Sequence, residues 1–169
     1  MNIFNQSAQR QRGFTLLLAA LVASVVLALG AAIFKLAQKE ITLSSIGRDS
    51  QYAFYAADTG AECALFWDLR YGYFATSSPP GVTPECDAQA IIASGRLATF
   101  PYTMTFQFAP SGFCTNVAVE KTKDAQNAIR TVVRADGYNV IVPEGNAALC
   151  DSMIAAAPRA LQRSVELHY

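Results

Sequence analysis

Residues 14–34 read FTLLLAALVASVVLALGAAIF and contain no charged side chain. At about 1.5 Å of rise per residue, such a run forms roughly 32 Å of helix, enough to cross a hydrocarbon layer about 30 Å thick. Lipid offers the backbone no hydrogen-bonding partner, so a segment that spans it in this way must be helical. The sequence therefore predicts one transmembrane helix near the N-terminus.

The residues before this run indicate its orientation. Residues 1–13 are polar, carry Arg10 and Arg12, and include no acidic residue. Because basic flanks stay in the cytoplasm, we expect the N-terminus inside the cell and everything after Lys35 outside. Two alternatives are an ordinary signal anchor and a secretory signal peptide cut near residues 28–30 or 30–32. Signal-peptide apolar cores run about 7–15 residues, so the length of this segment disfavours the second.

The start of the apolar run resembles a known processing site. Residues 12–16 read RGFTL, which is similar to the prepilin peptidase site of type IV pilins and pseudopilins. The resemblance implies cytoplasmic cleavage between Gly13 and Phe14, N-methylation of Phe14, and retention of the apolar helix as the core of a filament. It also implies three kinds of protein partner, namely other pilin or pseudopilin subunits, the prepilin peptidase and an inner-membrane assembly platform. Membrane lipid would surround the helix before assembly.

One position departs from the family pattern. Pilins usually carry a glutamate four residues after the new N-terminus, and this chain has Leu18 there. That glutamate is thought to neutralise the α-amino group of the subunit above, and a carboxylate in apolar surroundings is costly. The departure implies a minor, tip or initiating subunit, with nothing above it, rather than a shaft subunit. Residues 53–62, AFYAADTGAE, are also similar to the second helical half of PilX-like minor pilins.

Beyond Lys35 the chain becomes amphipathic and has no proline before Pro79. Its apolar residues recur at separations of three, four and seven residues, which predicts one continuous helix from about Phe14 to about Leu69. A set of small residues on this second half would let a sheet approach closely: Ala53, Ala56, Ala57, Ala61 and Ala64.

The rest of the chain predicts an antiparallel sheet after a long connection. Residues 71–100 are rich in Pro, Gly and Ser, with one short strand or helical turn expected at 88–93. Alternating apolar and polar residues predict strands at 101–108, 114–120, 128–138 and 159–169, separated by a polar connector at 121–127 and an irregular stretch at 140–158. We therefore expect an α+β protein in which a long N-terminal helix packs on a four-stranded antiparallel sheet. Its predicted parts are a leader (1–13), a transmembrane or filament-core helix (14–34), an amphipathic helix half (35–70), a connecting loop (71–100) and a sheet head (101–169).

Four cysteines lie on the expected outer side of the membrane, where disulfides can form: Cys63, Cys86, Cys114 and Cys150. Four cysteines permit three pairings. In a meander, the start of the second strand lies beside the end of the third, which Cys150 follows. This favours Cys114–Cys150 and leaves Cys63 with Cys86.

The sequence predicts neither an enzyme nor a cofactor. The only histidine, His168, stands two residues after Glu166 near the end of the chain, where a solvated side chain is more common than a catalytic base. No two cysteines have the two-to-four spacing of a zinc site, so we expect no metal.

The charge balance disfavours a nucleic acid partner. Thirteen basic and thirteen acidic residues give a formal net charge of zero. One small basic cluster, Lys121, Lys123, Arg130 and Arg134, falls in a single predicted hairpin and is a candidate DNA or anion patch. A solvated sheet face is the favoured interpretation, because no aromatic residues alternate with these charges.

Overall fold

The computed structural model describes residues 6–77, 81, 83–143 and 145–169, of which residues 6–12 are described by their backbone alone. The chain divides into two units, one up to Ile46 and one from Gly47 to Tyr169, and each is described by itself. Of the predicted leader, residues 1–13, the first five lie outside the described residues.

Helix α1 (Gln6–Tyr71) is continuous, as predicted, but begins earlier than the expected start at Phe14. Residues 6–12 include no proline, and Gly13 costs a helix only about 1 kcal/mol relative to alanine, so the helix runs through the predicted boundary. It ends where Gly72 adopts the left-handed conformation, with φ of +60°. The Gly72 N–H then donates to the Asp68 carbonyl at 2.9 Å, which satisfies a backbone acceptor of the last turn.

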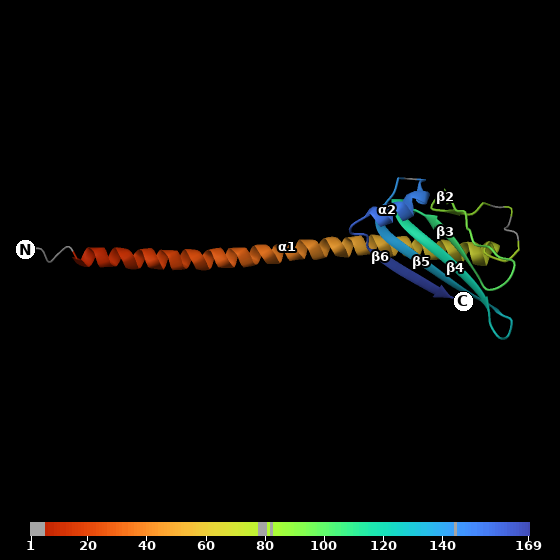
Figure 1. The fold of residues 1–169 in the computed structure, drawn as a ribbon, viewed down its shortest axis with the longest axis horizontal. Helices are drawn as coiled ribbons and strands as arrows, with labels where there is room; N and C mark the ends of the chain where they lie inside the picture. Colours follow the sequence, from red (N-terminus) through yellow and green to blue (C-terminus); the bar gives the residue numbers. More distant parts are fainter. Residues whose placement is uncertain (1–5, 78–80, 82, 144) are drawn as a thin grey trace, which may run out of the picture. The chain divides into compact units, whose positions relative to one another are not determined.

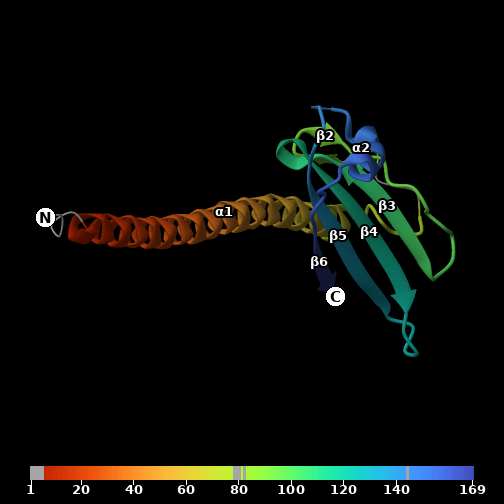
Figure 2. The same ribbon diagram turned by 60° about the vertical axis from the view of Figure 1, so that its left-hand side comes forward.

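The second unit contains the predicted four-stranded antiparallel sheet, in the order β3–β4–β5–β6. Its strands are β3 (Tyr102–Phe108), β4 (Phe113–Lys123), β5 (Ile129–Ile141) and β6 (Gln162–His168). This is an α+β fold, in which the second half of α1 lies along one face of the sheet (Figures 1 and 2).

Two predicted connections differ from the structure, and a third is narrowed to one of its two alternatives. The polar connector expected at 121–127 is shorter, because β4 runs to Lys123 and the Asp124 carboxylate accepts from the Gln126 and Ala128 N–H groups to close a tight turn. The irregular stretch expected at 140–158 holds the short helices η2 (Ala147–Leu149) and α2 (Cys150–Ala156). The connecting loop at 71–100 contains a two-residue hairpin, β1 (Glu85–Cys86) with β2 (Gln89–Ala90), so a short strand rather than a helical turn occupies part of 88–93.

The helix and sheet meet through small residues. The five alanines predicted to face the sheet are all buried: Ala53, Ala56, Ala57, Ala61 and Ala64. A Cβ atom at Gly137 of β5 would collide with the backbone of Ala53 and Ala57, so only glycine fits there. Close approach also lets the Thr115 hydroxyl donate to the Ala56 carbonyl at 2.9 Å.

Larger side chains fill the rest of the core. Alternation along the strands is as predicted, and the side chains buried beneath the helix include Tyr102, Met104, Phe106, Phe108, Val117, Val119, Val133 and Ala135. Phe74, which follows the helix, stacks on Phe106 with ring centroids 5.8 Å apart. The second unit, Gly47–Tyr169, which is called the head from here on, thus has a hydrophobic core of its own.

The connecting loop is tied to this core despite its length. The Arg96 guanidinium donates to the carbonyls of Tyr73, Ala75 and Ser77, and the Tyr102 hydroxyl donates to the Phe74 carbonyl at 2.6 Å. Trp67 donates from Nε1 to the Glu85 carbonyl at 3.0 Å. These bonds join the segment after α1 both to the helix and to the sheet.

Candidate functional site

The first candidate functional feature is the apolar part of α1. All residues from Gly13 to Arg48 are exposed, and the most apolar part of this helix is 0% buried. The helix is long and apolar enough to cross a membrane by its length and composition. A helix that is apolar on all sides requires lipid or other apolar helices around it, since water would meet a continuous hydrocarbon surface.

The residues of the predicted cleavage site lie within this helix. Gly13 has no neighbouring atom within 4 Å of the position a Cβ would take, and Phe14 and Leu18 are 68% and 54% exposed. The Gly13–Phe14 bond is therefore free of tertiary contacts with described residues. Leu18 presents its side chain to the surroundings, so the position where the resembling family has a carboxylate is an apolar surface here.

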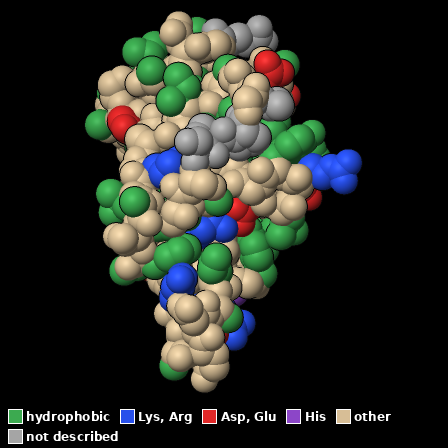
Figure 3. Space-filling model, turned by 90° about the vertical axis from the view of Figure 1, so that its right-hand side faces the viewer, with side chains coloured by type: hydrophobic (Ala, Val, Ile, Leu, Met, Phe, Trp, Pro, Cys, Tyr) green, Lys and Arg blue, Asp and Glu red, His purple; other side chains and the backbone are tan. Residues whose placement is uncertain are grey.

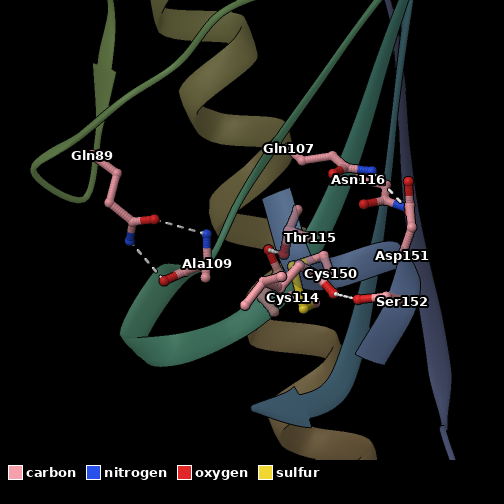
Figure 4. The surroundings of a disulfide bond; sticks show 11 residues. Gln89, Gln107, Ala109, Cys114, Thr115, Asn116, Cys150, Asp151 and Ser152 are labelled. Carbon is pink, nitrogen blue, oxygen red and sulfur yellow. Dashed lines mark hydrogen bonds between the residues drawn. A yellow bond between two sulfur atoms is a disulfide. The ribbon is translucent and has the colours of Figure 1, made fainter. Parts of the chain in front are cut away.

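The four cysteines form the two predicted disulfides. Cys63 on α1 joins Cys86 on β1, with Cα atoms 6.0 Å apart, and Cys114 on β4 joins Cys150 at the start of α2, with Cα atoms 5.5 Å apart. The first holds the connecting loop to the helix. The second holds α2 against the start of β4, as the close-up of this disulfide shows (Figure 4).

The predicted DNA or anion patch of Lys121, Lys123, Arg130 and Arg134 does not form. Lys121 lies on the face of the sheet covered by α1, whereas Arg130 and Arg134 lie on the opposite face. The two arginines pair with Asp124 and Asp136, and Lys123 lies 5.1 Å from the centre of the Phe100 ring. On the face drawn in the space-filling view, the Lys and Arg side chains are scattered rather than gathered into one patch (Figure 3). The four residues do not share a surface, because the alternation along β4 places Lys121 inward, whereas Arg130 and Arg134 lie on a solvated face, which was the favoured interpretation.

Lys121 instead forms a buried ion pair with Asp68, and the partly exposed Tyr169 bonds to the same carboxylate. The Lys121 Nζ and Asp68 Oδ2 atoms are 2.6 Å apart, and these side chains are only 9% and 6% exposed. The Tyr169 hydroxyl also donates to Asp68 Oδ2, at 2.9 Å, so one carboxylate ties the end of α1 to β4 and to the last residue of the chain. Burial, reinforced by the negative charge of Asp68, raises the pKa of the Tyr169 hydroxyl above its ordinary value.

Sequence reasoning missed these contacts, although a signal for Asp68 was present. Asp68 follows Ala57, Ala61 and Ala64 at spacings of four, three and four residues, which places it on the buried face of the helix. A carboxylate on such a face requires a buried cationic or hydrogen-bonding partner. The partner itself was not identifiable, because Lys121 and Tyr169 are 53 and 101 residues away in sequence.

His168 lies on an exposed edge strand. Its Nε2 atom is 2.7 Å from Glu166 Oε1, and both side chains are largely exposed. Among the described residues, no group of three His, Cys, Asp or Glu side chains is arranged to hold a metal ion.

The chain matches no protein-family model, no curated protein and no solved structure. The structure by itself defines an α+β protein with a membrane-compatible N-terminal helix that continues into a head with two disulfides.

Proposed function

We propose that this chain is a non-catalytic structural subunit of a type IV pilus or pseudopilus, of the minor, tip or initiating kind. The single observation that carries the proposal is the helix that follows Gly13. It is uncharged from Phe14 to Phe34, and its side chains there are exposed. The helix then continues without a break into the disulfide-bonded head. A cleavable basic leader directly before such a helix is the arrangement that the resembling family uses.

The proposed mechanism has two stages. The apolar part of α1 is first held in the cytoplasmic membrane, with the N-terminus inside and the head outside. The prepilin peptidase then cuts after Gly13, Phe14 is methylated, and the freed helix packs beside other pilin or pseudopilin subunits at the assembly platform. Small residues such as Gly30 and the alanines around it permit close approach of neighbouring helices.

The N-terminal mass of the mature protein, isolated from membrane and sheared-surface fractions, tests this proposal. We expect a chain that starts at methylated Phe14. A Gly13→Val variant should retain the leader, whereas the matched Gly30→Val variant should be cut normally, because both glycines have open space around them. An intact Met1 in the unmodified chain would support a signal anchor, and a start near residue 31 or 33 would support a secreted domain. Either result refutes the proposal.

The position of Leu18 gives a second test. An apolar side chain there offers no counter-charge to the α-amino group of a subunit above, so incorporation should occur at initiation or at the tip. We expect Leu18→Glu to increase the amount of this protein in filament shafts, measured by immunogold labelling along isolated filaments. Equal labelling of the shaft by both forms would contradict a tip position.

The second candidate function is an exported binding domain that remains anchored or is secreted, and does not assemble. One observation favours it, namely a head that has a buried hydrophobic core and two disulfides. Under this alternative the leader stays attached or the whole apolar helix is removed. The same mass measurement separates the two functions.

A further inference from the structure

Strand β6 is the open edge of the four-stranded sheet. It pairs with β5 on one side only, and Figures 1 and 2 show it as an outermost strand. The opposite edge, β3, is closed by other parts of the chain. Ser94 exchanges two backbone hydrogen bonds with Thr105, each of 2.9 Å. The Gln89 side chain donates to the Ala109 carbonyl and accepts from the Ala109 N–H (Figure 4). No described segment closes β6 in this way.

The register of β6 shows which backbone groups are open. Tyr169 and Thr131 exchange two hydrogen bonds, of 2.8 and 3.0 Å, so their backbones bond directly. In an antiparallel ladder, such pairs alternate with pairs that do not bond to each other. Leu167, Val165 and Arg163 therefore bond to β5. The residues between them direct their N–H and carbonyl groups away from the sheet, and all of these are exposed: Gln162, Ser164, Glu166 and His168.

Strand β6 lacks most of the features that keep sheet edges from pairing, which are proline, lysine, a bulge or an inward-facing charge. It contains no proline and no lysine, and its ladder with β5 shows no register shift. Its inward-facing arginine, Arg163, donates from Nε to Ser50 Oγ at 2.8 Å. Because this contact directs the guanidinium toward α1, the row of open backbone groups stays accessible.

An apolar surface of α1 lies beside this edge. Strand β6 contacts the helix at Ser50 and again at Asp68, so the helix runs along the inner side of the strand between these two contacts. Phe54 and Leu65 are one helical turn from Ser50 and Asp68, respectively, and so lie on the same side of the helix. Phe54 is 46% exposed and Leu65 is half-buried. An added strand would cover apolar side chains of both elements: Phe54, Leu65, Val165 and Leu167.

We propose that β6 accepts an extended segment of another polypeptide as an additional, antiparallel strand of the sheet. A row of alternating N–H and carbonyl groups is matched along its length by another extended backbone, which is the basis of recognition by strand addition. The segment has alternating apolar and polar residues, of which the apolar ones face α1. The proposal does not depend on pilus assembly, since an anchored or secreted head would carry the same edge.

A second copy of this chain fits the edge less well. Antiparallel pairing of two β6 strands requires a two-fold axis perpendicular to the sheet, which makes the two α1 helices run in opposite directions. Two copies that use α1 to enter the same membrane cannot adopt that arrangement. Pairing of β6 with β3 of another copy is hindered because Ser94 and Gln89 already close that edge.

The test uses the full chain with its disulfides intact, in a neutral detergent, and the peptide acetyl-Lys-Thr-Val-Thr-Val-Thr-Val-Thr-Lys-amide as the probe. Amide hydrogen exchange is followed by nuclear magnetic resonance. We expect saturating peptide to slow exchange of the outward N–H groups of Ser164, Glu166 and His168 about tenfold or more, whereas exchange at Val165 and Leu167, which already bond to β5, changes little. Absence of saturable protection would overturn the proposal. Protection that appears without peptide and grows with protein concentration would identify a second copy as the occupant and would also overturn it.

Methylation of the peptide nitrogens tests the geometry. When the valines face α1, the N–H groups of the threonines point to β6 and those of the valines point away. Methylating the three central threonine or the three valine nitrogens leaves every side chain unchanged. The first change should weaken binding about tenfold or more, because it removes donors to β6, and the second should weaken it less than about threefold. Equal effects, or the reverse order, would refute the pairing.

Two variants at one position locate the site. Glu166→Pro removes an N–H that faces away from the sheet, a change that edge strands tolerate, and should weaken peptide binding about tenfold or more. The matched Glu166→Thr variant removes the same side chain but keeps the N–H, and should change affinity less than about twofold. If Glu166→Pro fails to fold, the methylated peptides decide the question with the unmodified chain. Unchanged binding by the folded Glu166→Pro variant would refute the assignment.

Discussion

Replacing Asp68 by asparagine should lower the free energy of unfolding of the head by about 3–5 kcal/mol, the usual cost of leaving a buried charge without its partner. Lys121 Nζ lies 2.6 Å from the carboxylate, and the two side chains are 9% and 6% exposed. Asparagine preserves the volume of the side chain and an acceptor for the Tyr169 hydroxyl. The loss therefore reports the uncompensated ammonium rather than a cavity.

The double variant Asp68→Asn with Lys121→Met separates the ion pair from packing. It removes both charges and keeps an unbranched side chain of similar length beside Thr131. We expect the double variant to lose at least about 2 kcal/mol less than the sum of the two single losses, because neither charge is left alone. Arg130→Met is the control, since its ion pair with Asp124 is exposed and should contribute about 0–1 kcal/mol.

Trp67 provides the assay. It is the only tryptophan in the chain, is 7% exposed, and lies next to Asp68 on the helix. Urea unfolding of the full chain in neutral detergent, followed by its fluorescence with the disulfides intact, yields the free energy by linear extrapolation. A loss below about 1 kcal/mol for Asp68→Asn, or simple additivity in the double variant, would refute the argument that this pair is buried and coupled.

Three further predictions use the same assay. Gly137→Ala should destabilise the head by about 1–3 kcal/mol or more, because its Cβ would collide with the backbone of α1. The control Gly47→Ala, with open space around it, should be neutral or stabilising by about 1 kcal/mol. Equal effects of the two variants would contradict the close approach of β5 to α1. Replacing both Cys114 and Cys150 by serine opens a loop of 36 residues and should cost about 3.8 kcal/mol by chain entropy, and an unchanged urea midpoint would contradict the structural role of this bridge. The pKa of Tyr169 is raised in the folded state, so the unfolded chain releases this proton first. Stability should therefore fall as the pH rises above 10, and fall less steeply in Tyr169→Phe. Identical pH profiles would show that the hydroxyl does not bond to Asp68 in the folded protein.

Local patterns in the sequence determined the elements of this fold. An uncharged run from Phe14 to Phe34 followed by amphipathic periodicity predicts one long helix, and period-two alternation predicts four strands with one buried face. Both signals depend only on neighbours along the chain, which is why they were interpretable without a structure. The disulfides followed as well, since a meander brings the start of one strand beside the end of the next.

Only the tertiary structure decided which polar residues meet. The sequence presents Lys121 as one of four cations of a candidate surface patch. The alternation along β4 instead directs its side chain inward, to Asp68. The tertiary structure also decided that β6 is an open edge while Ser94 and Gln89 close β3, because alternation along a strand does not show what lies beside it. Both outcomes depend on the order and register of the strands, which are set by burial of apolar side chains far apart in sequence.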